Sequence, residues 1–205
     1  MENLDIEQIN KDLKGKSPEE IITWALSIAK NPLVTTNFRP YEVAILSACT
    51  QVDSELKVIW CDTGYNTPQT YKHANELINS LELNVHLYVP KQTSSYRDAV
   101  MGIPQIEDPN HAIFTEQVKL EPFNRAMAEH KPDVWFTNLR AGQTAFRNSI
   151  DIVSMSKDGL LKVSPFYHWS DEQLDTYLEE RNLPNEFKYF DPTKVLSNRE
   201  CGLHS

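Results

Sequence analysis

The sequence predicts an α/β fold in which a mainly parallel sheet is flanked by helices, and three observations favour it. Short apolar runs alternate with amphipathic, helix-length segments along most of the 205 residues, which is the pattern of βαβ units. Two capping boxes, Ser17–Glu20 and Ser170–Gln173, mark helix starts near either end of the chain. The pair Asp158-Gly159 between short apolar runs adds a tight hairpin.

The first half of the chain is expected to alternate helices with strands. Pro18 follows the first capping box at the favourable first helical position, and this helix should run to about Lys30. Two later helices also begin at prolines, because the fixed φ of proline suits a first helical turn. In chain order we then expect a strand over 33–36, a helix over 40–51, a strand over 57–61, a helix over 68–81 and a strand over 85–89.

The second half should complete the sheet and end in a tail. The expected elements are a helix over 116–131, a strand over 134–137, a hairpin of 152–156 with 160–164, and a helix over 170–181. From residue 183 on, prolines and polar residues predict an extended segment. We therefore expect one α/β domain over residues 1–184 and a C-terminal tail over 185–205, mobile because chain ends are rarely tied down.

Composition narrows the class of protein. A content of 40% hydrophobic and 24% charged residues is typical of soluble globular proteins. Apolar runs stay well short of a membrane helix, and the acidic first residues do not resemble a signal peptide. Three cysteines form no disulfide framework, which favours the reducing cytoplasm, and Cys49, Cys61 and Cys201 lack metal-site spacing. The net charge of −9 argues against a broad nucleic-acid surface.

The first candidate loop leads from a strand into a helix and reads Thr35-Thr36-Asn37-Phe38-Arg39. In open parallel sheets, ligands bind outside the carboxyl ends of the strands. Hydroxyls, backbone N–H groups and a helix N-terminus make a cradle for an anion, and Arg39 adds a positive charge. The loop lacks the pattern of a Walker loop, and a plain strand-to-helix connection is the alternative.

The second candidate loop follows the strand over 57–61 and contains Asp62, Thr63 and Gly64. A carboxylate at a strand end can accept a hydrogen bond from a sugar hydroxyl or a base amine, and glycine lets a ligand approach closely. The alternative is that Asp62 and Thr63 only cap the turn. Cys61 is expected to be a small buried hydrophobe rather than a nucleophile.

The third candidate segment follows the strand over 134–137 and contains Arg140, Gln143 and Arg147. Arginine is suited to binding phosphate or sulfate through two N–H groups at once. In a helix, the seven-residue spacing of the two arginines would place both guanidinium groups on one face. A solvated surface pair is the alternative.

The chain ends in Cys201-Gly202-Leu203-His204-Ser205. Arg199 and His204 lie close enough in sequence to favour the thiolate form of Cys201, which is the reactive form of cysteine. A thiolate on a swinging tail can enter a pocket, react, and then meet another protein. An ordinary surface cysteine is the alternative.

Together these pieces resemble the phosphoadenylyl-sulfate reductases of assimilatory sulfate reduction, which have the adenine-nucleotide α-hydrolase-like fold, a PP-loop fold similar to the Rossmann fold. The segment Arg199–His204 is similar to the family's catalytic tail, which is its most specific signature. In the family's order, the matching segments are Thr35–Arg39, Asp62–Tyr65 with Pro68, Thr70 and Tyr71, Leu120–Ala126, Trp135–Arg147 and Arg199–His204. The resemblance covers the chain from about Leu33 to its last residues.

The resemblance implies a reaction. Phosphoadenylyl sulfate would bind to a nucleotide-binding domain over 1–184, with its phosphates and sulfate among the first loop and the arginines. The Cys201 thiolate would attack the sulfate sulfur, expel adenosine 3′,5′-bisphosphate and become S-sulfocysteine, which is covalent catalysis in two steps. Reduced thioredoxin or glutaredoxin would then release sulfite. Arg199 and His204 would surround the thiolate.

The resemblance also implies a homodimer without a resident cofactor. One branch of the family uses adenylyl sulfate and holds a four-iron cluster through paired cysteines. Three cysteines at these spacings cannot supply such a cluster, so the 3′-phosphorylated substrate is favoured.

Two departures from the family pattern stand out. Arg39 occupies a position where members usually have glycine, so either the backbone approaches the ligand less closely or the charge binds phosphate directly. The connection 185–200 before the cysteine is shorter than usual, and Lys188, Tyr189 and Lys194 are candidates for the missing contacts.

Two other functions stay open. An ATP-pyrophosphatase-type adenylating enzyme shares the fold but usually carries an SGGKD-like loop, whose lysine and aspartate are absent from 35–39. A non-catalytic nucleotide-binding relative would account for Arg39 and the short connection, although the intact cysteine tail argues against decay.

Overall fold

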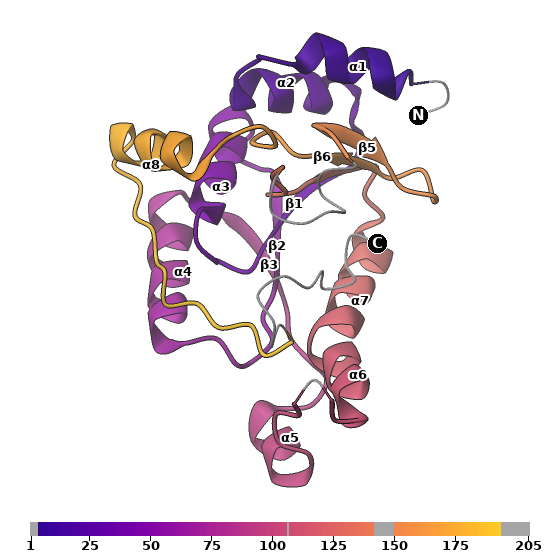
Figure 1. Ribbon diagram of the computed structural model, residues 1–205, viewed down its shortest axis with the longest axis vertical. Coiled ribbons are helices and arrows are strands. Elements are labelled where there is room, and N and C mark those ends of the chain that lie inside the picture. Colours follow the sequence, from indigo (N-terminus) through magenta and orange to yellow (C-terminus); the bar gives the residue numbers. More distant parts are fainter. Residues whose placement is uncertain (1–3, 106, 142–149, 194–205) are drawn as a thin grey trace.

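The computed structural model describes residues 4–105, 107–141 and 150–193. Its centre is a six-stranded sheet with the order β3-β2-β1-β4-β6-β5, and helices cover both faces (Figure 1). All neighbouring strands are parallel except β5 and β6. The predicted α/β fold with a mainly parallel sheet and one hairpin is confirmed. The strands are β1 (Pro32–Thr36), β2 (Lys57–Cys61), β3 (Asn84–Tyr88), β4 (Val134–Phe136), β5 (Val153–Met155) and β6 (Leu161–Val163).

The helices include those expected from the sequence and three others. Both predicted capping boxes form, at the starts of α2 and α8. The sequence analysis missed α1, α5 and α6, which have only eight, seven and six residues, too few for a clear helical period. Within the described ranges, no helix is long and apolar enough to cross a membrane. The helices are α1 (Ile6–Leu13), α2 (Pro18–Ile28), α3 (Glu42–Val52), α4 (Pro68–Ser80), α5 (Ser94–Val100), α6 (Asn110–Thr115), α7 (Glu121–His130) and α8 (Asp171–Glu180).

A π-helical turn, η1 (Glu116–Leu120), joins α6 to α7 where one continuous helix was expected. Pro122 explains the change, because it has no N–H for the carbonyl of Val118 and its ring crowds that carbonyl. The N–H of Glu121 instead reaches back five residues to the carbonyl of Glu116. Lys119 lies in this turn and is buried, and π-turns of this kind are frequent at functional sites.

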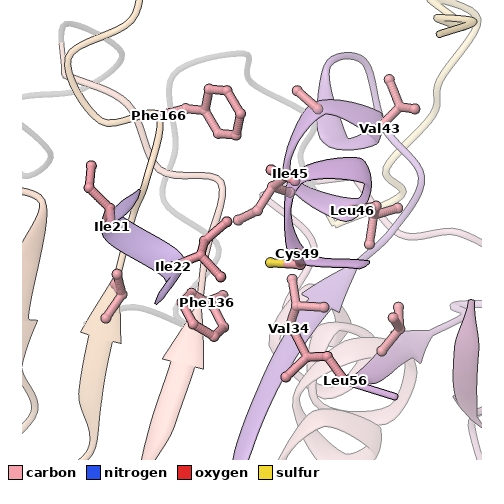
Figure 2. Close-up of a cluster of buried hydrophobic side chains, with 14 of the residues drawn as sticks. Ile21, Ile22, Val34, Val43, Ile45, Leu46, Cys49, Leu56, Phe136 and Phe166 are labelled. Carbon is pink, nitrogen blue, oxygen red and sulfur yellow. The ribbon is translucent and has the colours of Figure 1, made fainter. Parts of the chain in front are cut away.

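The core has two parts, because alternate residues of each strand face opposite sides of the sheet. The larger part joins Val34, Val58 and Phe136 to apolar side chains of α2, α3 and α8. Figure 2 shows Cys49 of α3 in this cluster, near Ile22 of α2 and Phe136 of β4. The smaller part lies on the other face and packs side chains of β1, β2 and β4 against α7.

The topology brings the candidate loops together. Strand β1 pairs with β2 on one side and with β4 on the other, and Leu33 lies opposite both Lys57 and Trp135. The chain therefore builds the β2–β3 side first and then crosses to β4. Ligands of open α/β sheets bind at the carboxyl edge beside such a change of direction. The loops after β1, β2 and β4 all leave this edge.

Candidate active site at the carboxyl edge of the sheet

The loop after β1 folds around one buried carboxylate, that of Glu42 in the first turn of α3. Its Oε2 accepts hydrogen bonds from the Thr36 hydroxyl (2.8 Å) and from the backbone N–H groups of Asn37 (2.8 Å) and Arg39 (3.4 Å). Its Oε1 accepts a hydrogen bond from Arg39 Nε at 2.6 Å, which makes an ion pair. The donors of the first loop thus surround a carboxylate of the chain itself, and binding of a ligand anion by this loop stays a prediction.

Sequence reasoning missed Glu42. The signal was a glutamate at the first position of a helix whose preceding residue, Tyr41, offers no side-chain cap. An acid in that first turn is favoured by the unpaired N–H groups and the positive end of the helix dipole.

Two other residues of the first loop serve its packing. Phe38 is buried and lies edge-on to Trp60 at the end of β2, with ring centres 4.9 Å apart. Its φ of 53° falls in the left-handed region, a conformation that persists only where the surroundings impose it. The Thr35 hydroxyl accepts a hydrogen bond from Trp135 Nε1 at 3.0 Å. These contacts tie the loop to β2 and β4.

The loop after β2 is organised by Asp62. Its Oδ1 accepts hydrogen bonds from Gly64 N (2.9 Å), Asn66 Nδ2 (2.9 Å) and the Tyr71 hydroxyl (3.0 Å). Burial and the Asp62 charge raise the pKa of Tyr71 to about 12, so this hydroxyl stays a donor. In this structure the Asp62 carboxylate therefore caps the turn, and its contact with a sugar hydroxyl or a base amine stays a prediction.

The two other polar positions of this loop also shape the backbone. The Thr63 hydroxyl accepts a hydrogen bond from Tyr65 N at 3.2 Å. Gly64 has a φ of +80°, and a Cβ added there would meet Ser94 only at 3.7 Å, an ordinary contact. Its backbone angle therefore explains the glycine better than crowding does.

The two cysteines in the described ranges are both buried. Burial raises the pKa of the Cys61 thiol to about 12, although the Arg125 and Lys119 charges lower it. Burial also raises the pKa of Cys49, further than that of Cys61. The expectation that Cys61 is a small buried residue is confirmed, and its raised pKa disfavours the thiolate, which is the reactive form.

The segment after β4 brings Arg140 beside Tyr41, two residues after the first loop. Its guanidinium carbon lies 5.3 Å from the ring centre of Tyr41, and its Nη1 donates to Asp171 Oδ1 at 2.5 Å. In the described structure, Arg140 Nε and Asn138 Oδ1 are buried without a hydrogen-bond partner. Buried polar atoms of this kind usually find a partner, so they mark a place where a polar ligand or water can bind.

The first part of the predicted tail, residues 185–193, is docked on these loops, and we call it the docked segment. Asn185 Oδ1 accepts a hydrogen bond from Tyr41 N at 2.9 Å. The Lys188 carbonyl accepts from the hydroxyls of Thr67 (2.6 Å) and Thr70 (3.2 Å). Lys188 thus contacts the body through its carbonyl, at the start of α4.

Several predicted site residues lie outside the described residues, namely Gln143, Arg147, Lys194, Arg199, Cys201 and His204. The structure therefore places Arg39, Arg140 and the first two loops at the same edge of the sheet, and the placement of the six residues just named stays a prediction. In the ranges that it describes, no three His, Cys, Asp or Glu side chains meet as metal ligands would.

The chain is similar to known proteins along most of its length. The family model of the phosphoadenosine phosphosulfate reductase domain matches residues 31–190. The phosphoadenosine 5′-phosphosulfate reductase of Proteus mirabilis (strain HI4320) is 32% identical over 190 residues, which cover 89% of this chain and 76% of that protein. The chain belongs to the phosphoadenosine phosphosulfate reductase family. The protein of the same name from Xylella fastidiosa (strain M12) is another relative of this reductase-family chain, 32% identical over 187 residues that cover 88% and 76%.

Solved structures agree on the fold of this reductase-family chain. The phosphoadenylyl-sulfate reductase from Candida auris, in a phosphate complex, has a TM-score of 0.79 at 24% identity and covers 90% of both chains. The NH3-dependent NAD synthetase from Campylobacter jejuni has a TM-score of 0.56 at 11% identity, covering 90% of this chain and 77% of the other. These likenesses confirm the predicted adenine-nucleotide α-hydrolase-like fold.

Proposed function

We propose that the chain reduces phosphoadenylyl sulfate to sulfite and adenosine 3′,5′-bisphosphate through a covalent intermediate on Cys201. Family membership supports the reaction, and one structural observation supports the choice of nucleophile. Of the three cysteines, Cys49 and Cys61 are buried with raised pKa values. That leaves Cys201 as the cysteine for the role, within the segment similar to the family's catalytic tail.

The proposed chemistry balances in two displacements. The Cys201 thiolate attacks the sulfur of the sulfate group, an S–S bond forms, and the S–O bond breaks with its electron pair leaving on the nucleotide phosphate. A thiolate of reduced thioredoxin or glutaredoxin then attacks Cys201 Sγ and expels sulfite with the S–S electron pair. The second thiol of the donor resolves the mixed disulfide, so the dithiol is oxidised and the sulfur is reduced. This thiol chemistry requires a reducing compartment, which fits the cytoplasm.

We assign anion binding chiefly to Arg140. In its ion pair, only the Asp171 side chain is largely exposed, at 66%, so water competes for that carboxylate. A phosphate or sulfate group can therefore replace Asp171 beside the buried guanidinium, where charge developing on the leaving group would be stabilised. The N–H groups of the first loop are already used by Glu42, so we assign that loop to shaping the site. Gln143 and Arg147 are proposed to complete the anion site.

Mass spectrometry of the purified protein tests the proposal. We expect phosphoadenylyl sulfate without reductant to add one sulfonate to the C-terminal peptide, and thioredoxin to release it as sulfite. Cys201→Ser should abolish both products, while Cys61→Ala, the matched control, should keep them. Sulfite from Cys201→Ser at the wild-type rate would refute the mechanism. Light scattering will test the proposed homodimer.

A further inference from the structure

The docked segment carries a buried charge contact that the proposed function does not use. Lys119 Nζ lies 2.5 Å from Asp191 Oδ2 and 3.3 Å from Thr193 Oγ1. Both charged side chains are nearly inaccessible, at 5% and 6% exposure. In the other ion pairs of the described ranges, at least one partner is 10% exposed or more.

Both partners of this ion pair are held in place by their surroundings. On one side, the π-turn η1 buries Lys119 beneath the docked segment. On the other, Asp191 Oδ1 accepts hydrogen bonds from the backbone N–H (3.0 Å) and the hydroxyl (2.7 Å) of Thr193. The carboxylate is therefore held in one orientation before it meets the ammonium group. Burial alone would raise the pKa of Asp191, but the Lys119 charge and these hydrogen bonds leave it below its ordinary value.

The place of the contact connects it with the site. The docked segment runs from α8 along α4 and then crosses toward α6 and α7 (Figure 1). On the way it contacts Tyr41, two residues after the first loop, through Asn185, and the start of α4 through Lys188. The Lys119 charge also acts on Cys61, the last residue of β2. The ion pair therefore lies at the carboxyl edge, beside the proposed nucleotide site.

A buried ion pair is a poor source of net stability, because desolvation of the two charges offsets their attraction. Such a pair can instead specify one arrangement among several, since any other register leaves a buried charge unpaired. Here it joins residues 72 positions apart, so the arrangement that it specifies is the path of the chain just before the last twelve residues.

We propose that Lys119 and Asp191 are positioning residues, whose ion pair fixes the point from which the C-terminal segment leaves the body and so sets how often Cys201 meets the bound nucleotide. This inference rests on the proposed function of Cys201. Cys201 follows Thr193 by eight positions, and a chain of that length spans at most about 28 Å when fully extended.

The size of the effect follows from chain length. Upstream of the ion pair, the carbonyl of Lys188 is hydrogen-bonded to the start of α4, thirteen positions before Cys201. The effective concentration of a tethered group falls roughly as the −3/2 power of tether length, so lengthening from eight to thirteen residues lowers it about two-fold. Without the ion pair, the chain also loses a fixed direction at the point where it leaves the body, which lowers the effective concentration further.

The test measures the first chemical step alone. Full-length protein is mixed with phosphoadenylyl sulfate without reductant, and sulfonation of Cys201 is followed in time by mass spectrometry. We expect Asp191→Asn to lower this rate at least about two-fold, with the Kd for adenosine 3′,5′-bisphosphate unchanged and with Asp191→Glu restoring part of the rate. Leu174→Ala, a core change in α8, is the control for lost stability. A wild-type rate in Asp191→Asn, or an equal loss in Leu174→Ala, would overturn the proposal.

A second variant leaves the buried pair intact, in case Asp191→Asn does not fold. Eight Gly and Ser residues inserted after Thr193 double the tether, and we expect sulfonation to slow about three-fold. An unchanged rate would overturn the positioning role.

A third measurement separates this proposal from the proposed function, because it needs no turnover. Spin labels on Cys201 and on a cysteine introduced by Ser80→Cys report the distance between the tail and α4, and the buried Cys49 and Cys61 will escape labelling. We expect a broader distribution of distances in the labelled protein that carries Asp191→Asn than in the labelled protein that keeps Asp191. Identical distributions would overturn the positioning role, whereas absence of sulfonation in wild type would overturn only the proposed function.

Discussion

The first loop and the docked segment both bury a carboxylate against a cation, but over very different distances along the chain. Glu42 pairs with Arg39, three residues away, and also satisfies N–H groups of its own loop. Asp191 pairs with Lys119, 72 residues away, on a different element. The first contact shapes one loop, whereas the second joins two parts of the molecule. The comparison indicates that local charge pairs fix loop shape, and distant pairs fix how segments are placed relative to one another.

The largest effect should come from breaking the distant pair. We expect Lys119→Met to lower the free energy of unfolding by about 3–5 kcal/mol at pH 7, because it leaves the Asp191 charge buried and unpaired. Urea unfolding followed by circular dichroism measures the change. A loss below about 1 kcal/mol would mean that water reaches Asp191 and that the pair is not a buried one.

The same variant should show a characteristic pH dependence. In wild type the folded pKa of Asp191 is lowered, so the pair stabilises the fold above the unfolded value of about 3.9 and this stabilisation is lost as pH falls through the folded pKa. In Lys119→Met, burial without the cation should raise the folded pKa, so the penalty appears as pH rises above about 4. The difference between the two proteins should therefore shrink below pH 4. A constant difference from pH 3 to 8 would contradict this assignment.

Breaking the local pair should cost less. Glu42→Gln keeps the shape and one acceptor but removes the charge that pairs with Arg39, whose side chain is 26% exposed and so within reach of water. We expect a loss of about 1–3 kcal/mol in urea unfolding. A loss larger than that of Lys119→Met would reverse the ranking of the two regions.

Removing an uncharged contact of the docked segment should lower the free energy of unfolding by less. Asn185→Ala removes the acceptor for Tyr41 N and should cost about 0.5–1.5 kcal/mol. Hydrogen exchange of the Tyr41 amide measures the local effect, and we expect faster exchange there than in wild type. Unchanged exchange would show that this contact does not protect the first loop.

The smallest effect should come from an exposed pair. Lys11 and Glu7 lie four residues apart in α1, with side chains 63% and 82% exposed. We expect Lys11→Met to change the free energy of unfolding by less than about 0.5 kcal/mol, because solvent screens the pair. It is the matched control for Lys119→Met, and a loss above 1 kcal/mol would mean that burial does not explain the ranking.

The same distinction explains what the sequence could predict. Capping boxes, the helix starts at Pro18 and Pro68 and the Asp-Gly hairpin depend on neighbours within four residues, and the structure has them where they were expected. The start expected at Pro40 is wrong, because Tyr41 has a left-handed backbone and α3 begins at Glu42. The role of Glu42 is also local and could have been inferred from its place in a first turn. The ion pair of Lys119 could not, because nothing near residue 119 in sequence indicates a carboxylate at 191. The turn that contains Lys119 also depends on Pro122, which the sequence analysis placed inside one continuous helix over 116–131.

The central position of β1 has a consequence for the nascent chain. This strand is made within the first 36 residues, yet its β4 neighbour ends at residue 136. At a synthesis rate of about 5–20 residues per second, one edge of β1 waits about 5–20 s for its partner on the ribosome. An unpaired, apolar strand edge is a template for misassociation with other chains. Chaperone demand during translation should therefore be highest before residue 136 emerges.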